Sequence, residues 1–181
     1  MKIILLIFLL ILTGCQRPSG TDASPSSSSS FDDAGGQDDP TNYPSYPFNF
    51  DAETPDGIMI ETKQLNHPPL EDIDTWYAEV QQCVADWYAV LYPSRTFDFV
   101  LSSPVVLDNN TSLSVYCGNG GTTGVYCTNY QIPFIALDAG SAQFAYQWKH
   151  EFIHHILYSN DFSNQMNFNH QPSQIWDCQY N

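Results

Sequence analysis

The pattern of hydrophobic and polar positions divides the chain into three parts. Residues 3–12 form an unbroken apolar run, and residues 16–54 are rich in Ser, Pro, Gly and Asp. The second segment cannot bury enough apolar surface to offset the entropy that it would lose on ordering. From Asp56 onward the pattern acquires the periodicities of helices and strands. The sequence therefore predicts one folded domain over residues 56–181, behind a disordered tether over residues 15–55.

Two segments of the folded part have helical periodicity. In residues 71–92, apolar side chains recur every three or four positions, which indicates one helix with a single buried stripe. Pro93 would end this helix, because proline cannot continue the backbone hydrogen bonding. Residues 142–158 predict a second helix, which follows a turn at residues 138–141.

The remaining ordered segments have the composition of strands. Two of them flank a glycine-rich loop, as the arms of a hairpin do. Pro133 lies in another of them, and proline within a strand indicates the edge of a sheet. The expected strands are residues 57–65, 96–102, 113–117, 124–127 and 132–137.

The N-terminus has the features of an export signal. Lys2 precedes the apolar run, which is too short to span a bilayer, and small residues lead to Cys15. The ending L-T-G-C resembles the lipobox of bacterial lipoproteins; the alternative is an ordinary signal peptide that ends by chance at a cysteine. The resemblance implies that residues 1–14 are removed and that lipid on Cys15 anchors the protein to a membrane. Gln16, in place of Asp, favours the outer membrane of the bacterial envelope.

The chain is strongly acidic, which limits its partners. It has five Lys and Arg against 20 Asp and Glu, a formal net charge of −15. Removal of residues 1–14 takes away Lys2 and no acid, so the mature chain of 167 residues would carry −16. Such a surface repels nucleic acid and anionic lipid headgroups. We therefore expect no nucleic-acid partner and expect the lipid, not a basic patch, to provide the anchor.

Four further cysteines follow the lipidation site: Cys83, Cys117, Cys127 and Cys178. In an exported chain they suggest two disulfides, for which three pairings exist. Cys117 and Cys127 flank the glycine-rich loop 118–126, so we expect a local Cys117–Cys127 bond, which leaves Cys83 to pair with Cys178. The spacings contain no C-x-x-C, which argues against a cysteine metal site.

Residues 150–154 match the pattern H-E-x-x-H. On a helix, His150 and His154 lie one turn apart on the same face, where both imidazoles can bind one zinc ion. Glu151 would stand beside the metal and take a proton from a bound water. With five His and five Glu in the chain, the pattern arises by chance only about 0.004 times. The alternative is a core helix with satisfied histidines, in which a charged Glu151 would be costly to bury without a partner.

A zinc site of this kind needs a third protein ligand. No glutamate follows residue 151, and the glycine and third histidine of a metzincin are missing after residue 154. His155 lies off the ligand face, so we expect it at the surface or beside a ligand. His170 stands in a loop long enough to fold back, and a neutral imidazole suits zinc. We favour His170 over Asp161 as the third ligand, with Asp177 as a further candidate.

With these residues the chain resembles the zincin-like metallopeptidases. It is more closely similar to small bacterial lipoproteins in which H-E-x-x-H-H precedes a third histidine, a Trp and a Cys, here His170, Trp176 and Cys178. The resemblance implies a minimal α+β zincin, with a support helix, a small twisted and mostly antiparallel sheet, and an active-site helix. It also implies that residues 132–137 are the edge strand that lines the cleft, and that the Cys83–Cys178 bond holds the His170 loop near the site.

We therefore expect a monomeric, lipid-anchored zinc endopeptidase that hydrolyses peptide bonds outside the cytoplasm, with Glu151 as general base and His150, His154 and His170 as Zn²⁺ ligands. Its partners would be peptide or protein substrates and, through Cys15, a membrane. Two alternatives remain open: an inactive exported zinc-binding or interaction module, and a hydrolase of peptidoglycan cross-links.

Overall fold

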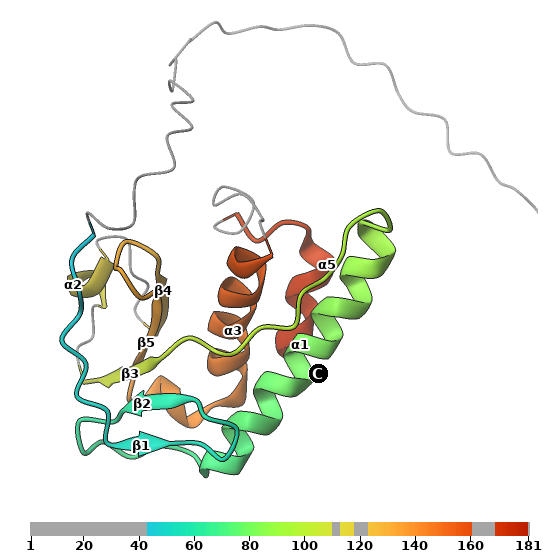
Figure 1. Cartoon of the computed structure of the whole chain (residues 1–181). Coiled ribbons are helices and arrows are strands. Elements are labelled where there is room, and N and C mark those ends of the chain that lie inside the picture. The colour runs from blue at the N-terminus through green and yellow to red at the C-terminus, as the bar shows by residue number, and fades with distance from the viewer. Residues whose placement is uncertain (1–42, 110–112, 118–122, 161–168, 181) are drawn as a thin grey trace, which may run out of the picture. The chain divides into compact units, whose positions relative to one another are not determined.

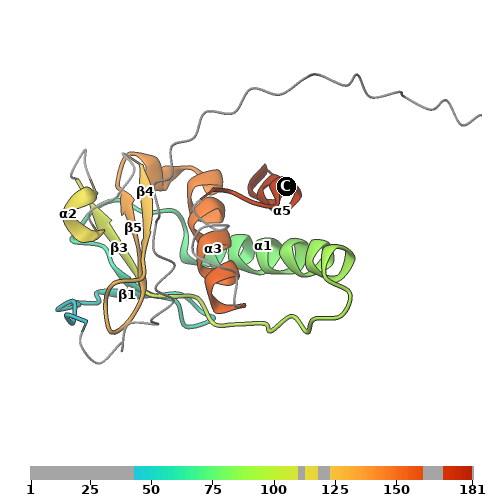
Figure 2. The ribbon, with the colours of Figure 1, turned by 90° about the horizontal axis from the view of Figure 1, so that it is seen from above.

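The computed structural model describes residues 43–109, 113–117, 123–160 and 169–180. These residues form a five-stranded sheet and two long helices, α1 (Leu70–Leu91) and α3 (Ala145–Ser159), with shorter helical elements around them. In two perpendicular views α3 lies between the sheet and α1 (Figures 1 and 2). The fold class is α+β, as expected.

The strands of the described residues follow the order β1-β2-β3-β5-β4 in a mixed sheet. The two outer pairings are antiparallel and the two inner pairings are parallel. The expectation of a mostly antiparallel sheet was therefore wrong, because α1 carries the chain across from β2 to a parallel β3. The strands are β1 (Ala52–Glu53), β2 (Met59–Glu61), β3 (Val105–Asp108), β4 (Gly124–Cys127) and β5 (Phe134–Asp138).

Strand β5 is an interior strand and not the sheet edge that Pro133 suggested. It pairs on both sides, so that Ala136 lies between Val106 of β3 and Val125 of β4. Pro133 precedes the first strand residue, Phe134, and its missing N–H therefore interrupts no ladder bond. Among the described strands, β4 is the one at the sheet edge that packs next to α3.

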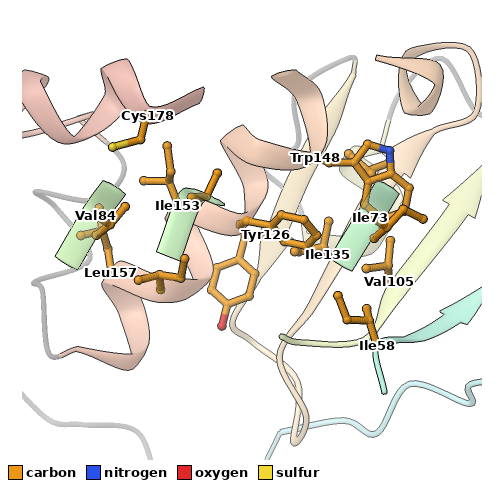
Figure 3. Packing of buried hydrophobic residues seen from close by; sticks show 14 of the residues in the cluster. Ile58, Ile73, Val84, Val105, Tyr126, Ile135, Trp148, Ile153, Leu157 and Cys178 are labelled. Carbon is orange, nitrogen blue, oxygen red and sulfur yellow. The ribbon is translucent and has the colours of Figure 1, made fainter. Parts of the chain in front are cut away.

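One face of the sheet packs against α1 and α3 and forms the main hydrophobic core. Trp148 of α3 approaches Ile73 of α1 over the strands, and Ile153 lies with Val84 and Cys178 farther along (Figure 3). The helical spacing of the apolar residues gives α1 one buried stripe, as the sequence predicted. Helix α3, between the sheet and α1, is instead buried around most of its circumference, and this packing fixes its rotation and so where its polar side chains point.

The opposite face of the sheet is covered by residues that the sequence analysis assigned to the tether. Tyr46 and Phe48 pack against Phe134, with ring centroids 4.8 and 5.5 Å away. Strand β1 also lies in this segment and pairs with β2. The folded part therefore begins before the expected boundary at residue 56, because the aromatic residues of this polar segment bury against the sheet.

Residues 114–117 form a short helix, α2 (Ser114–Cys117), where a hairpin arm was expected. Leu113 and Tyr116 are both buried on the outer face of the sheet. Positions three apart share a face on a helical turn but point to opposite faces of a strand. A turn, closed by a 3.0 Å bond from the Tyr116 N–H to the Leu113 carbonyl, therefore buries both side chains.

Residues 96–102 were expected as a strand, but this segment is not part of the sheet. Its backbone groups instead form hydrogen bonds with side chains of α1 and of Asn160, which follows α3. The Asn160 side chain accepts from the Asp98 N–H at 2.8 Å and donates to the Asp98 carbonyl at 3.1 Å. Gln81 donates to the Val100 carbonyl at 2.6 Å. These bonds satisfy the segment without a strand partner.

Two disulfides join described residues, and both match the expected pairings. Cys83–Cys178 links α1 to the C-terminal 3₁₀-helix η3 (Asp177–Tyr180), and Cys117–Cys127 links α2 to β4. Structural disulfides persist in oxidising compartments, so they indicate an extracytoplasmic environment.

Several expectations fall on residues outside the described part. They concern the signal peptide at residues 1–14, lipidation at Cys15, most of the tether and the alternative ligand Asp161. Of the helices that are described, none has both the length and the apolar character needed to cross a membrane.

Candidate metal centre

His150, His154 and His170 come together beside α3. One nitrogen from each ring lies within 4.8 Å of the other two. The ring centroid of His150 is 5.0 Å from those of His154 and His170, which are 5.3 Å from each other. His150 and His154 are one turn apart on α3, and the loop that leads into α5 (Ser173–Trp176) brings His170 to them. The fold thus gathers the three histidines that the sequence analysis selected.

His170 reaches this cluster from an uncommon backbone conformation. Its φ is 52°, in the left-handed region, where a non-glycine residue is disfavoured by about 1–2 kcal/mol. Histidine is one of the residue types that are enriched there. Such a conformation persists only when the surrounding structure holds it, and it is found most often at functional positions.

Gln179 orients the His150 ring. The His150 Nδ1–H donates to Gln179 Oε1 at 2.8 Å, which leaves the Nε2 lone pair of this imidazole available to a metal. In metal-binding histidines, a hydrogen bond from the ring nitrogen that does not bind the metal usually fixes the tautomer. Gln179 lies in η3, directly after Cys178, so the Cys83–Cys178 disulfide ties its segment to α1.

Burial favours the neutral form of two of the three imidazoles, which is the form that binds a metal. It lowers the pKa of His150 and of His170 below the usual value of 6.5. Three imidazoles are a donor set that zinc takes in proteins. Nitrogens on a tetrahedral zinc would lie about 3.3 Å apart, so a spread of up to 4.8 Å needs small side-chain movements only. The residues fit this metal.

Glu151 is buried between α3 and the edge strand β4. Glu151 is 3% exposed, and its Oε2 has no hydrogen-bond partner within the described residues. Burial raises the pKa of this carboxyl to about 8. The carboxyl lies against Gly124, where a Cβ would come within 2.5 Å of Oε1. A buried carboxyl oxygen without a partner is costly, and a packing role does not explain it.

Trp176 packs against the histidine cluster. Its ring centroid lies 4.3 Å from that of His170, 4.7 Å from His154 and 5.1 Å from His150. The residue is 5% exposed and belongs to α5, immediately before the disulfide-bonded η3. One aromatic side chain thus contacts all three imidazoles, of which His154 is buried, His150 half-buried and His170 exposed.

His155 turns away from the cluster and anchors a different segment. Its Nε2–H donates to the Leu101 carbonyl at 2.7 Å, and its Nδ1 accepts from Ser103 Oγ at 2.8 Å and from the Tyr126 hydroxyl at 3.1 Å. Burial lowers its pKa, which is consistent with a neutral ring. The expectation of a surface position was wrong, because the residue is only 7% exposed. Its role is to hold residues 101–103 against α3.

Asp177, a further candidate ligand, is exposed and belongs to no metal-type cluster within the described ranges. The sequence patterns in turn did not indicate Gly124 or Gln179 as site residues. Gly124 carried a weak signal, because a glycine inside a strand often marks the close approach of another group. Gln179 carried none beyond its position next to Cys178.

Comparisons of this chain with protein-family models, with curated proteins and with solved structures found no match.

Proposed function

We propose that this protein is a zinc-dependent endopeptidase of the cell envelope. One observation carries the proposal: the buried Glu151, whose Oε2 has no partner in the described residues, directly follows a histidine of the His150–His154–His170 cluster. In a helix with only a packing role, such a carboxyl would be hydrogen-bonded or replaced by an apolar side chain. A hydrolytic site, by contrast, needs a base with an available lone pair.

The metal would be held by His150, His154 and His170. Zinc there would polarise the scissile carbonyl and lower the pKa of a water molecule, so that a nucleophile is available near neutral pH. Its positive charge would also favour the ionised form of Glu151. Gln179 supports this arrangement, because its bond to Nδ1 of His150 leaves Nε2 of that ring as the atom that could bind the metal.

Glu151 would be the general base and then the general acid. It would take one proton from the attacking water and give it to the nitrogen of the leaving amine. Burial strengthens the carboxylate as a base, because it raises the affinity of Glu151 for a proton. The walls formed by β4 and Trp176 would keep bulk water away from this proton transfer.

The edge strand β4 is the surface that we propose for an extended peptide substrate. It is the strand nearest to Glu151, through the contact at Gly124, and it ends the sheet among the described strands. Unpaired backbone groups on an edge strand can form ladder bonds with a peptide. This assigns to β4 the role that the resemblance to zincins implied for residues 132–137.

The cellular location is proposed from the N-terminal sequence together with the disulfides. The L-T-G-C ending at Cys15 would supply a lipid anchor, and Gln16 favours the outer membrane. The acidic tether would hold the catalytic part away from the bilayer. Labelling with a fatty-acid analogue should depend on Cys15.

The decisive experiment combines metal analysis with a peptide-library and casein cleavage assay. Wild-type protein should bind about one zinc per chain and cleave, and Glu151→Gln should keep the zinc and lose at least about 100-fold in kcat. Glu71→Gln makes the same chemical change at an exposed position of α1 and should remain active. A Glu151→Gln protein that still cleaves would remove Glu151 from the mechanism. Tight zinc binding with no cleavage by the wild type would favour a binding module instead.

A further inference from the structure

We propose that the indole Nε1–H of Trp176 contacts the substrate, as the donor that binds the scissile carbonyl oxygen and the negative charge that develops on it. This inference rests on the proposed peptidase function and adds to it the group that stabilises the oxyanion.

Position is the first observation. Trp176 lies against His150, His154 and His170, with ring centroids between 4.3 and 5.1 Å away. Because Nε1 belongs to this ring system, the N–H lies near the histidine cluster. A carbonyl oxygen polarised at that cluster would therefore lie close to this donor.

The second observation is that the N–H has no acceptor. Trp176 is 5% exposed, and no hydrogen-bond partner for Nε1 exists in the part of the chain that the structure describes. A buried donor without an acceptor is unfavourable by about 1–3 kcal/mol. If packing were the only purpose of this side chain, phenylalanine would fill much of the same space without that cost.

Trp148 provides a comparison within the same chain. It is fully buried in the core, and its Nε1–H donates to the Ala142 carbonyl at 2.8 Å. The fold thus satisfies the N–H of a tryptophan that has only a packing role. The buried N–H of Trp176, near the histidine cluster, instead has no acceptor among the described residues.

Two unsatisfied buried atoms therefore occur in this region, and their chemistry is complementary. Glu151 Oε2 is an acceptor and Trp176 Nε1 is a donor, and they are the buried side-chain atoms without partners in the described ranges. Peptide hydrolysis needs one group of each kind. The acceptor takes a proton from water, and the donor stabilises the oxygen that becomes negative.

The step balances with these groups. The water oxygen forms a bond to the carbonyl carbon, the C–O π pair moves onto the carbonyl oxygen, and Glu151 takes the water proton. As the pair returns, the C–N bond breaks and Glu151 gives its proton to the amine nitrogen. The Trp176 N–H keeps its own proton throughout and donates a hydrogen bond that strengthens as charge develops.

The test replaces Trp176 in the full-length zinc protein by 3-benzothienylalanine, which has the shape of tryptophan but sulfur in place of the N–H. Trp176→Phe is a second variant, and the same analogue at Trp76, in the first half of α1, is the matched control. We expect kcat/KM to fall about 10²–10³-fold in the Trp176 analogue. Zinc affinity should stay within about threefold, and the control should keep its activity.

A readout besides activity is the affinity for a phosphinic peptide, which mimics the tetrahedral transition state. Its Kd should rise in parallel with the loss in kcat/KM, while the Kd for the cleaved peptide products should change little. If the wild type cleaves and the analogue keeps full activity and full affinity for the phosphinic peptide, the Trp176 proposal fails and the peptidase stands. If the analogue loses its zinc, the N–H has a structural role and the proposal fails. If the wild type cleaves nothing, both proposals fail.

Discussion

Gly124 on the edge strand lies directly against the carboxyl of Glu151. A Cβ built on Gly124 would come 2.5 Å from Glu151 Oε1 and 3.0 Å from its Cδ and Cγ. Real Cβ atoms do not approach other atoms so closely, so glycine at this position is what leaves space for the carboxyl. The strand that would receive a substrate and the base that would activate water are thus fitted to each other.

Gly124→Ala should therefore move the carboxyl of Glu151 without removing any of the proposed zinc ligands. A displacement of about 1 Å can lower a catalytic rate by about 100-fold, and overpacking should lower the free energy of unfolding by about 1–3 kcal/mol. Peptidase kinetics, zinc content and denaturant unfolding measure these effects. Gly140→Ala is the control, because its Cβ would meet only the Asp138 side chain, at 3.1 Å. Equal kcat in the two variants would contradict the proposed positioning.

The bond from His150 to Gln179 should contribute to metal affinity. Gln179→Leu removes the acceptor for the Nδ1–H and should weaken zinc binding about 10–100-fold, as loss of such partners does in other metal proteins. Competition with a chromophoric chelator measures this affinity. Gln174→Leu makes the same change at an exposed residue of the neighbouring α5 and should leave the affinity unchanged. If both variants bind zinc like the wild type, the bond at 2.8 Å does not orient a ligand.

The two disulfides should differ in their effect on the candidate metal site. Cys83–Cys178 closes a separation of 95 residues and Cys117–Cys127 one of 10, so chain entropy predicts losses of about 5 and about 3 kcal/mol when each is removed. Only the first bond ties down η3, with Gln179 and the adjacent Trp176. Replacing both of its cysteines by serine should weaken zinc binding about tenfold or more, whereas the other double variant should keep the affinity. Denaturant unfolding and chelator competition test the pair, and identical zinc affinities would contradict this assignment.

The zinc-free protein should lose stability as the pH rises from 4.5 to about 8, owing to Glu151. Burial raises its pKa from 4.5 to about 8, so in this window the folded state binds more protons than the unfolded state. The free energy of unfolding then falls with pH by at most about 1.4 kcal/mol per unit. The lowered pKa values of His150, His155 and His170 act in the opposite direction below pH 6.5, where the unfolded chain binds more protons.

The difference between wild type and Glu151→Gln isolates the glutamate in this measurement, because both proteins share the histidines. Chemical unfolding at several pH values, with a chelator present, should give curves that separate in favour of the glutamine variant as the pH rises. Parallel curves would show that the carboxyl is not held in a desolvated position in the folded state.

Local patterns allowed part of the fold and site to be predicted without a structure. Residues 71–92 and 142–158 were correctly expected as helices because a stripe repeated every three or four residues needs no distant partner to be recognised. His150, Glu151 and His154 have a fixed relation for the same reason, since the helical repeat sets their spacing. The Cys117–Cys127 bond was foreseeable because only a short loop separates the two cysteines.

Non-local contacts decided the features that the patterns did not predict. The placement of β5 between β3 and β4 depends on pairing across the sheet, and the helical turn of α2 depends on the surface that buries Leu113 and Tyr116. Residues 46–53 looked like tether because their aromatic side chains acquire a partner surface only when the sheet forms.

The sequence by itself thus determined the helix that carries the motif, the acidic charge and the donor types offered to a metal, because each depends on residues that are neighbours in the chain. Only the tertiary structure decided that His170 joins His150 and His154, that Gln179 orients the first ring and that Gly124 leaves space for Glu151. These contacts join residues 16 to 29 positions apart in the sequence. Their geometry follows from the packing of α3 against the sheet and from the disulfide that ties η3 to α1, and no local periodicity encodes either.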